Sequence, residues 1–246
     1  MPSRFKFEQT KGLFITGTDT GVGKTLLAGA IVERLRTQGR SVGVFKPIAT
    51  GCRREREGFV SDDAEFLAQC AESEGPLSEI NPVRYQEPLA PWVATERSGC
   101  EINWEDMQRA YADLAQTHQG MIVEGIGGVM VPLMRDYFVL DLMVDMNLPV
   151  IIVARSTLGT LNHTLLTVNQ CRQRGLSIRG IVINGYRAET ADIAQETNTR
   201  VLAELSGAPV LTVMPYEKST CVERGLLGEE VSAAVGLVRW GDLIDA

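Results

Sequence analysis

The stretch LFITGTDTGVGKTLLAGAIVERL, residues 13–35, constrains the fold more than any other part of this chain. A short apolar run enters a turn with glycines, meets a lysine and a threonine, and leaves as a helical pattern. Gly17, Gly21 and Gly23 admit positive φ angles and a close approach of the backbone to a ligand. The N–H groups of such a loop and the positive end of the following helix form a nest for an anion. The sequence therefore predicts a strand, a phosphate-binding loop and a helix in direct succession.

The first residues of that helix indicate a nucleoside triphosphate as the ligand. Lys24 can reach the β- and γ-phosphates, and the Thr25 hydroxyl can ligate Mg²⁺. The usual pattern is G-x-x-x-x-G-K-[ST]; here Gly17 lies one residue farther back, and Thr18 stands at the expected glycine. The alternative is a glycine-rich turn with an incidental Lys-Thr pair. The strand before the loop and the helix after it favour phosphate binding.

Short apolar runs alternate with helical patterns along the chain. The runs are rich in Val and Ile with little polar alternation, as expected for strands buried on both faces. They occupy residues 13–16, 42–46, 121–124, 150–154, 181–184 and 210–213. The helical patterns occupy residues 24–39, 62–73, 103–120, 160–175 and 189–207, with Asp or Asn caps at the start of the second and third. This alternation predicts an α/β fold of the P-loop NTPase type, doubly wound, with a mostly parallel sheet and helices on both faces.

The composition is that of an ordinary globular protein. The 246 residues are 44% apolar, and the net charge of −7 argues against a nucleic-acid-binding surface. Five scattered cysteines and two histidines predict neither a disulfide framework nor a structural zinc site. No apolar run approaches the roughly 18 residues of a membrane span, and the first residues lack the apolar core of a signal peptide. We expect a cytoplasmic protein in one domain, residues 1–246, with no nucleic-acid or membrane partner.

Two acidic residues are candidates for holding magnesium, which prefers carboxylate and water oxygens. Asp63 starts a predicted helix after the second strand, where an ordinary first-turn helix acid is an equal alternative, and Asp62 could exchange roles with it. Glu124 ends the apolar run MIVE and leads into a glycine turn. A carboxylate at the tip of a buried parallel strand lies on the ligand side of the sheet.

A second lysine follows the second strand in VFKPIATG. Lys46 would face the same sheet edge as Lys24, and a plain surface lysine is the alternative. Two lysines beside one triphosphate exceed what binding requires, which suggests that a second anion is neutralised there. Thr50 and Gly51 continue this loop and could donate hydrogen bonds to an oxyanion.

Five motifs, in the same order, resemble those of the dethiobiotin synthetase family: GTDTGVGKT, FKPIATG, SDDAEFL, VEGIGGVMVPL and LGTLNHTLLT. The resemblance runs from about residue 13 to about residue 217. It implies a parallel-sheet P-loop fold, a homodimer, ATP and Mg²⁺ as cofactors, and the small molecules 7,8-diaminopelargonate and CO₂ as substrates. The implied enzyme is a ligase of biotin biosynthesis that carboxylates the diamine and closes a cyclic urea, releasing dethiobiotin, ADP and phosphate.

The resemblance also implies which residues form the site. The nucleotide would contact Gly21, Val22, Gly23, Lys24, Thr25, Leu26, Asp63, Glu124, Gly127, Asn184 and Pro215. Magnesium would be held by Thr25, Asp63 and Glu124. Lys46 would act on the carbamate and the mixed anhydride, with Lys24 nearby. The substrate would contact Thr20, Thr50, Leu161 and Asn162, the last two reaching the neighbouring subunit's site from a helix N-terminus.

The implied chemistry suits these residue types. A carbamate oxygen attacks the γ-phosphate, and the second amine then closes the ring and expels phosphate. Charge gathers on phosphoryl and carboxyl oxygens, which two lysines, a loop of N–H donors and one metal can stabilise. The alternatives are an amide-forming P-loop ligase and a switch ATPase of the partitioning or septum-positioning type. The first usually carries a glutaminase domain, and the second usually has a further lysine early in its phosphate loop.

Three features stay open at the level of sequence. Beyond about residue 218 no further motif is assigned, and either Glu217 or Glu223 could be the acid on the adenine side. The charged insert at residues 52–59 is read as a solvated loop, with a lid as the alternative. His163 could transfer protons or only pack at the predicted subunit interface.

Overall fold

The computed structural model describes residues 4–56 and 58–245. Its centre is a six-stranded parallel sheet in the order β12-β11-β10-β1-β7-β2. The strands are β1 (Gly12–Gly17), β2 (Gly43–Phe45), β7 (Met121–Gly128), β10 (Val150–Arg155), β11 (Ile178–Tyr186) and β12 (Val210–Pro215). Each strand contains or overlaps one of the predicted apolar runs, so the predicted fold class is confirmed.

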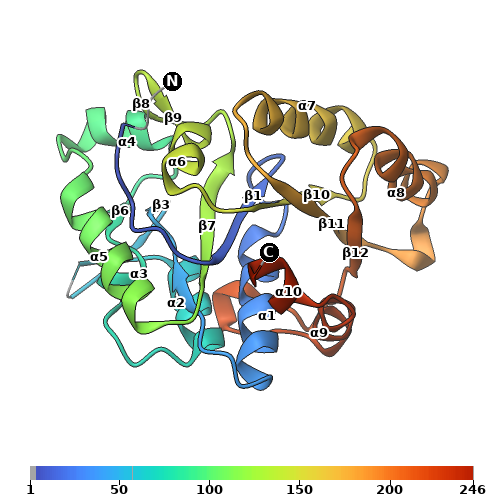
Figure 1. The fold of residues 1–246 in the computed structure, drawn as a ribbon, viewed down its shortest axis with the longest axis horizontal. Coiled ribbons are helices and arrows are strands. Elements are labelled where there is room, and N and C mark those ends of the chain that lie inside the picture. Colours follow the sequence, from blue (N-terminus) through green and yellow to red (C-terminus); the bar gives the residue numbers. More distant parts are fainter. Residues whose placement is uncertain (1–3, 57, 246) are drawn as a thin grey trace.

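Helices cover both faces of the sheet (Figure 1). One face carries α1 (Lys24–Thr37), α2 (Asp62–Ala71), α9 (Glu229–Gly236) and α10 (Trp240–Asp245). The other carries α5 (Trp104–Thr117), α6 (Val139–Met146) and α7 (Thr160–Gln173). Successive residues of a strand point to opposite faces, so Phe14 enters the core under α5 to α7, whereas Leu13 and Ile15 enter the core under α1. Two apolar layers therefore hold the central strands from either side.

Short elements decorate the sheet. A parallel pair, β3 (Ile48–Thr50) and β6 (Val83–Tyr85), extends beyond β2. The insert at residues 52–59 contributes to a hairpin of β4 (Arg53–Glu55) and β5 (Gly58–Val60). The remaining elements are α3 (Leu77–Ile80), α4 (Pro91–Ser98), the hairpin β8 (Pro132–Met134) and β9 (Tyr137–Phe138), α8 (Ile193–Ser206), and 3₁₀ turns at Ala188–Thr190 and Val222–Arg224.

Two predicted helix starts differ from the structure. The cap of α2 is Ser61, whose hydroxyl oxygen accepts from the Ala64 N–H at 3.4 Å, and Asp62 is the first helical residue instead. The helix predicted from residue 189 begins at Ile193, because Asp192 forms a capping box with Gln195. The predicted Asn103 cap of α5 is confirmed, since its side chain accepts from the Asp106 N–H at 3.1 Å.

The segment beyond residue 218 completes the core under α1. Trp240 and Ile244 are 1% and 3% exposed and pack into that layer. The carboxylate of Asp245 pairs with Arg40 at 2.8 Å and with Lys11 at 3.1 Å. Across the described residues, every helix is too short or too polar to cross a lipid bilayer.

Candidate active site

The loop after β1 has the geometry of an anion nest. Gly21 and Gly23 have φ angles of 70° and 99°, values that side-chain-bearing residues rarely adopt, and α1 begins at the next residue, Lys24. Gly17 is not one of the positive-φ glycines. A Cβ there would lie 2.6 Å from Val22 Cγ2, so this glycine permits close packing of the loop on itself.

A cavity of about 410 Å³ opens over this loop at the carboxyl ends of the strands. Most of the predicted site residues line it: Thr20, Gly21, Gly23, Lys24, Thr25, Leu26, Lys46, Thr50, Asp63, Glu124 and Gly127. Val22 is 2% exposed and packs in the core behind the loop. Ala49, Ile126 and Val222 also line the cavity, and no sequence signal singled out these three apolar residues.

Lys46, Asp63 and Glu124 meet in the wall of this cavity. Lys46 follows Val44 by two residues and Glu124 follows Ile122 by two, so both side chains point toward α1 and α2. The Lys46 Nζ lies 2.6 Å from Glu124 Oε1 and 2.9 Å from Asp63 Oδ2. Glu124 lies within β7, which continues to Gly128, and not at the strand's end as its sequence position indicated.

The structure also shows where Asp62, the alternative metal ligand, and the charged insert lie. Asp62 pairs with Arg53 of the β4–β5 hairpin, whereas Asp63 is the acid that lines the cavity. Arg53 also pairs with Glu55 and Glu65, so one guanidinium attaches the hairpin to α2. The described residues of the insert, 52–56 and 58–59, therefore contribute to a hairpin that is paired with α2.

In the cluster of Lys46, Asp63 and Glu124, burial and the neighbouring opposite charges shift each pKa in opposite directions. Burial disfavours the Lys46 ammonium, but Glu124 and Asp63 override it and raise the pKa of Lys46. Burial raises the pKa of Glu124, while for Asp63 the nearby Lys46 outweighs burial and lowers the pKa. For Lys24, burial and then the charge of Lys46 lower the pKa to about 8.

One buried oxygen in this cluster fits a metal ion. Glu124 Oε1 accepts from the Thr25 hydroxyl at 2.9 Å and from Lys46 at 2.6 Å. Its second oxygen, Oε2, is buried with no hydrogen-bond partner in the described part of the chain. An unpaired carboxylate oxygen beside a threonine hydroxyl and the half-exposed Asp63 is the hard-oxygen donor set that Mg²⁺ prefers.

The outer side of the loop is tied to the sheet by an ion pair. The Lys24 Nζ donates to the Asp19 carbonyl at 2.9 Å, and Asp19 Oδ1 accepts from the Thr20 N–H at 2.7 Å. Arg155, the last residue of β10, donates to Asp19 Oδ2 at 2.6 Å. The sequence interpretation missed Arg155, although a cation at the carboxyl end of a strand is the signal that drew attention to Lys46.

Residues predicted for the adenine side lie at the ends of β11 and β12. The Asn184 amide donates to the Val22 carbonyl at 2.9 Å, which leaves its oxygen available. Pro215 is the last residue of β12. Of the two acids left open, Glu217 accepts from backbone N–H groups at the start of α9, and Glu223 lines the 410 Å³ cavity over the phosphate loop.

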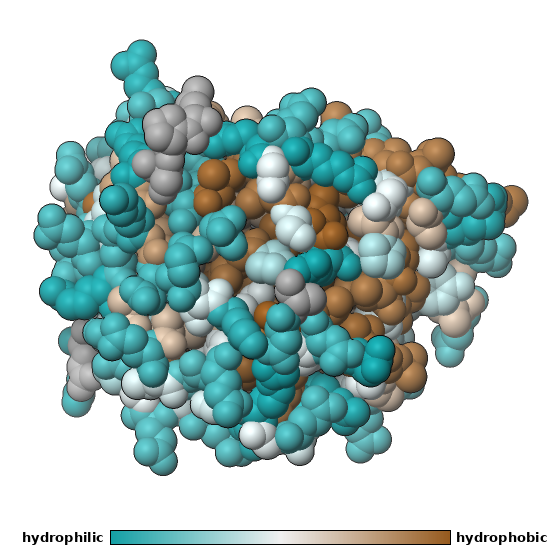
Figure 2. All heavy atoms as spheres, in the orientation of Figure 1, coloured by the Kyte–Doolittle hydropathy of each residue, from teal (hydrophilic) through white to brown (hydrophobic). Residues whose placement is uncertain are grey.

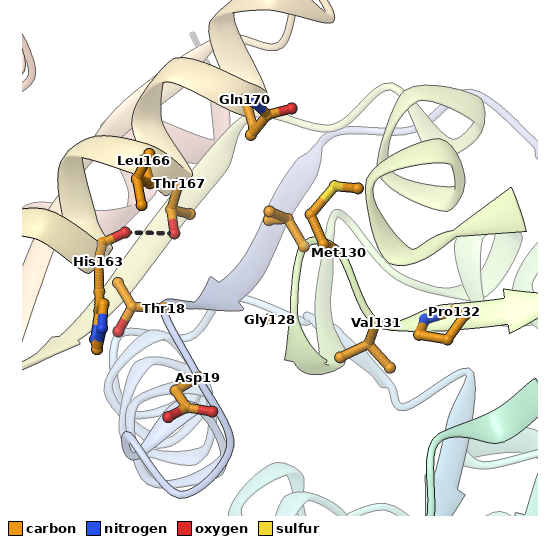
Figure 3. Close-up of a pocket in the computed structure, with 11 residues that line it drawn as sticks. Thr18, Asp19, Gly128, Met130, Val131, Pro132, His163, Leu166, Thr167 and Gln170 are labelled. Atoms are coloured by element: carbon orange, nitrogen blue, oxygen red, sulfur yellow. Dashed lines mark hydrogen bonds between the residues drawn. The ribbon is translucent and has the colours of Figure 1, made fainter. Parts of the chain in front are cut away.

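A second cavity, of about 490 Å³, lies on the other side of the phosphate loop (Figure 3). Thr18 and Asp19 line one side of it, His163 and Leu166 of α7 another, and Met130 a third. Leu161 and Asn162 lie on the first turn of α7 and line neither this cavity nor the 410 Å³ cavity over the phosphate loop. Within one chain, these two predicted substrate contacts are therefore not among the residues that line the cavity over the loop.

Comparison with known sequences separates the functional alternatives. A family profile described as "AAA domain" matches residues 11–223. The ATP-dependent dethiobiotin synthetase BioD of Thermodesulfovibrio yellowstonii is 39% identical over 237 residues, which cover 92% of this chain and 99% of the relative. The enzyme of the same name from Bacillus subtilis is 38% identical over 205 residues, covering 83% of this chain and 87% of the relative.

The solved structures that resemble this chain share its fold at low identity. MinD of Pyrococcus horikoshii, complexed with Mg-ADP, superposes with a TM-score of 0.57 at 13% identity, over 95% of this chain and 96% of that one. The MinC:MinD complex of Aquifex aeolicus gives 0.57 at 12% identity, over 93% of each chain. These values support the P-loop architecture alone, whereas the sequence relatives carry the finer assignment. The chain belongs to the ATP-dependent dethiobiotin synthetase family.

Proposed function

We propose that this chain carboxylates 7,8-diaminopelargonate with CO₂ and closes the ureido ring, using ATP and Mg²⁺. The observation that carries the proposal is the Lys46 ammonium, 3% exposed, held between Asp63 and Glu124 beside the phosphate loop. A nucleotide-binding site alone does not require a second buried lysine. A reaction that passes through a carbamate and an acyl phosphate does, because both carry negative oxygens next to the triphosphate.

Lys46 and Lys24 each stabilise a different set of negative oxygens during the reaction. One amine of the substrate adds to CO₂ and loses a proton, and the resulting carbamate oxygen attacks the γ-phosphorus while ADP leaves. The second amine then attacks the carbonyl carbon and phosphate leaves. Lys46 stabilises the carboxyl oxygens in both steps, and Lys24 with the N–H groups of the loop stabilises the phosphoryl oxygens.

Magnesium would be held by Thr25, Asp63 and Glu124, the last through its unpartnered Oε2. When bound there it supplies a Lewis acid that neutralises charge on the phosphates. Thr20 and Thr50, which line the same cavity, are assigned to the reacting end of the substrate. The Asn184 oxygen and the backbone at Pro215 are assigned to adenine.

The same proposal includes a homodimer in which α7 of one chain completes the substrate site of the other. Apolar surface is gathered on the face between α6 and α7, as Figure 2 shows. Leu166 and Met130, which line the 490 Å³ cavity, are 55% and 52% exposed, which is costly for large apolar side chains in water. Leu161 and Asn162 lie at the start of α7 and are assigned to the substrate carboxylate of the neighbouring subunit.

The deciding experiment is mass-spectrometric detection of the cyclic urea from the diamine, bicarbonate, ATP and Mg²⁺. We expect ADP release that depends on the diamine and one cyclic urea formed per ADP. ATP hydrolysis that responds to DNA or lipid vesicles and not to the diamine would instead assign the chain to the nucleotide-switch class.

A further inference from the structure

Asn81 is a buried polar residue that the proposed reaction does not use. It follows α3, is 0% exposed, and its amide nitrogen donates to the carbonyls of Lys46 at 2.6 Å and Val83 at 3.2 Å. The amide oxygen has no hydrogen-bond partner among the residues described. Turning the amide over would set this oxygen against two carbonyl oxygens, so the nitrogen must face them. The side chain therefore works as a donor.

The position of Lys46 in the sheet explains why it needs that donor. Lys46 follows the edge strand β2, which pairs with β7 only as far as Phe45. The next residue, Pro47, has no N–H to offer to a neighbouring carbonyl. The Lys46 N–H donates to the Ile80 carbonyl at 2.8 Å. Both backbone polar groups of the lysine are thus held by residues 80–81, from a part of the chain 35 positions away.

The same contact begins the strand pair β3–β6, and β3 ends at Thr50, which is assigned to the substrate. The Val83 N–H donates to the Pro47 carbonyl at 3.3 Å. From there β3 and β6 pair in parallel, with Ile48 opposite Val83 and Thr50 opposite Tyr85. A shift at residue 81 would consequently move the chain on both sides of Pro47.

We infer that Asn81 is a positioning residue for Lys46, and that it sets the place of the ammonium which acts on the carbamate. The lysine ammonium sits on a flexible four-carbon chain. The position of its Nζ therefore depends on a fixed backbone as well as on the carboxylates that pair with it. Those partners, Glu124 and Asp63, lie 2.6 and 2.9 Å from Nζ, a geometry that tolerates little displacement. The inference rests on the proposed role of Lys46.

A double-mutant cycle on the full chain tests this role. Asn81→Ala is expected to lower kcat for cyclic-urea formation by about 10- to 100-fold, the effect of a misplacement of about 1 Å, with KM for ATP changed by less than about threefold. In a Lys46→Ala background the same substitution is expected to lower kcat by less than about twofold, because the group it positions is gone. Equal losses in both backgrounds would overturn the inference.

Asn198 offers a matched control. It is 3% exposed, and its amide donates to the carbonyls of Ser156 at 2.8 Å and Thr157 at 3.5 Å. Whatever Asn198→Ala does to kcat should be the same with and without Lys46. Asn81→Leu keeps the approximate shape of the side chain and removes the donor, so near-normal turnover in this variant would also refute the inference.

The remaining outcomes are decisive as well. If neither Asn81 variant folds under conditions where Asn198→Ala folds, Asn81 is required for the fold itself and the positioning role is rejected. If the unmodified chain yields no cyclic urea at all, the proposed function fails before the cycle is run. Circular dichroism and the thermal midpoint of each variant separate these cases.

Discussion

At the scale of single residues, two glycines of the phosphate loop differ in what a side chain would meet. A Cβ at Gly23 would lie 2.0 Å from the Asn184 Nδ2, whereas one at Gly21 would meet nothing within 4 Å. Both have positive φ, which costs an alanine about 1–2 kcal/mol. Gly23→Ala must in addition displace Asn184 from the Val22 carbonyl. We expect it to weaken ATP binding at least about tenfold more than Gly21→Ala, measured by calorimetry. Equal affinities would contradict this contact.

Replacing Lys46 and replacing Lys24 should have different effects on turnover and on ATP binding. Lys46→Ala is expected to lower kcat by about 10²- to 10³-fold, as the loss of one oxyanion donor does, with the Kd for ATP changed little. Lys24→Ala should weaken ATP binding itself, because Lys24 lines the cavity over the phosphate loop and is assigned to the phosphoryl oxygens. Equilibrium binding of ATP with excess Mg²⁺, beside turnover measurements, checks both. A matching loss of ATP affinity in Lys46→Ala would reject its assignment to the carbamate.

The types of the site residues could be read from the sequence, but their contacts could not. Lys46 and Glu124 attracted attention because each follows an apolar run that had to be a buried strand. Their ion pair joins positions 78 residues apart, and no local pattern specifies such a pairing. Asn81 and Arg155 were missed for the same reason, since their roles arise only when distant segments meet.

At the scale of elements, the ion pair of Arg155 and Asp19 connects β10 to the phosphate loop. Both side chains are about half exposed, at 47% and 51%, so the pair is worth about 0.2–1 kcal/mol. Arg155→Ala should therefore raise KM for ATP by up to about fivefold, and by less at high salt. Arg200→Ala removes the exposed Arg200–Glu204 pair of α8 and is the control. An unchanged KM at low salt would show that the pair does not hold the loop.

Elements were predictable where the pattern was long and repeated. All six strands of the main sheet coincide with apolar runs. The helices α1, α5 and α7 begin and end near polar residues or glycines of the kinds that mark helix ends. The helix α6, VLDLMVDM, was not predicted, because it spans only eight residues and six of them are buried. The pair β3–β6 has strands of three residues each, too short for alternation to show, and its partners lie far apart in sequence.

The last helix offers a pH test of its anchoring. Hydrogen bonds from Arg40 and then Lys11 hold the pKa of Asp245 at about 2, below the unfolded value of 3.8. A lowered pKa means that the contribution is present above pH of about 4 and is lost as the pH falls toward 2. The free energy of unfolding of Asp245→Asn should thus lie below that of the unmodified chain near neutral pH and converge with it in acid. Parallel curves throughout would contradict the anchoring.

At the scale of the whole molecule, the proposed homodimer predicts complementation between two inactive chains. Lys24→Ala damages the nucleotide side of a site, and Asn162→Ala damages the part assigned to the neighbouring subunit. A mixed dimer contains one site in which both parts are intact, so mixing the two variants should restore activity, up to about half of the normal value per such dimer. Activity that stays at the level of the separate variants would argue against a shared site.

The core beneath α1 is completed by the last helices of the chain, and this affects folding during synthesis on the ribosome. β1 and α1 leave the ribosome early, but β1 lies between β7 and β10, and α9 and α10 cover the layer under α1. Domains tend to fold while synthesis proceeds from the N-terminus. Here the phosphate loop cannot gain its final support until residues 229–245 have been translated. A nascent chain arrested before them should expose the apolar face of α1 and depend on chaperones.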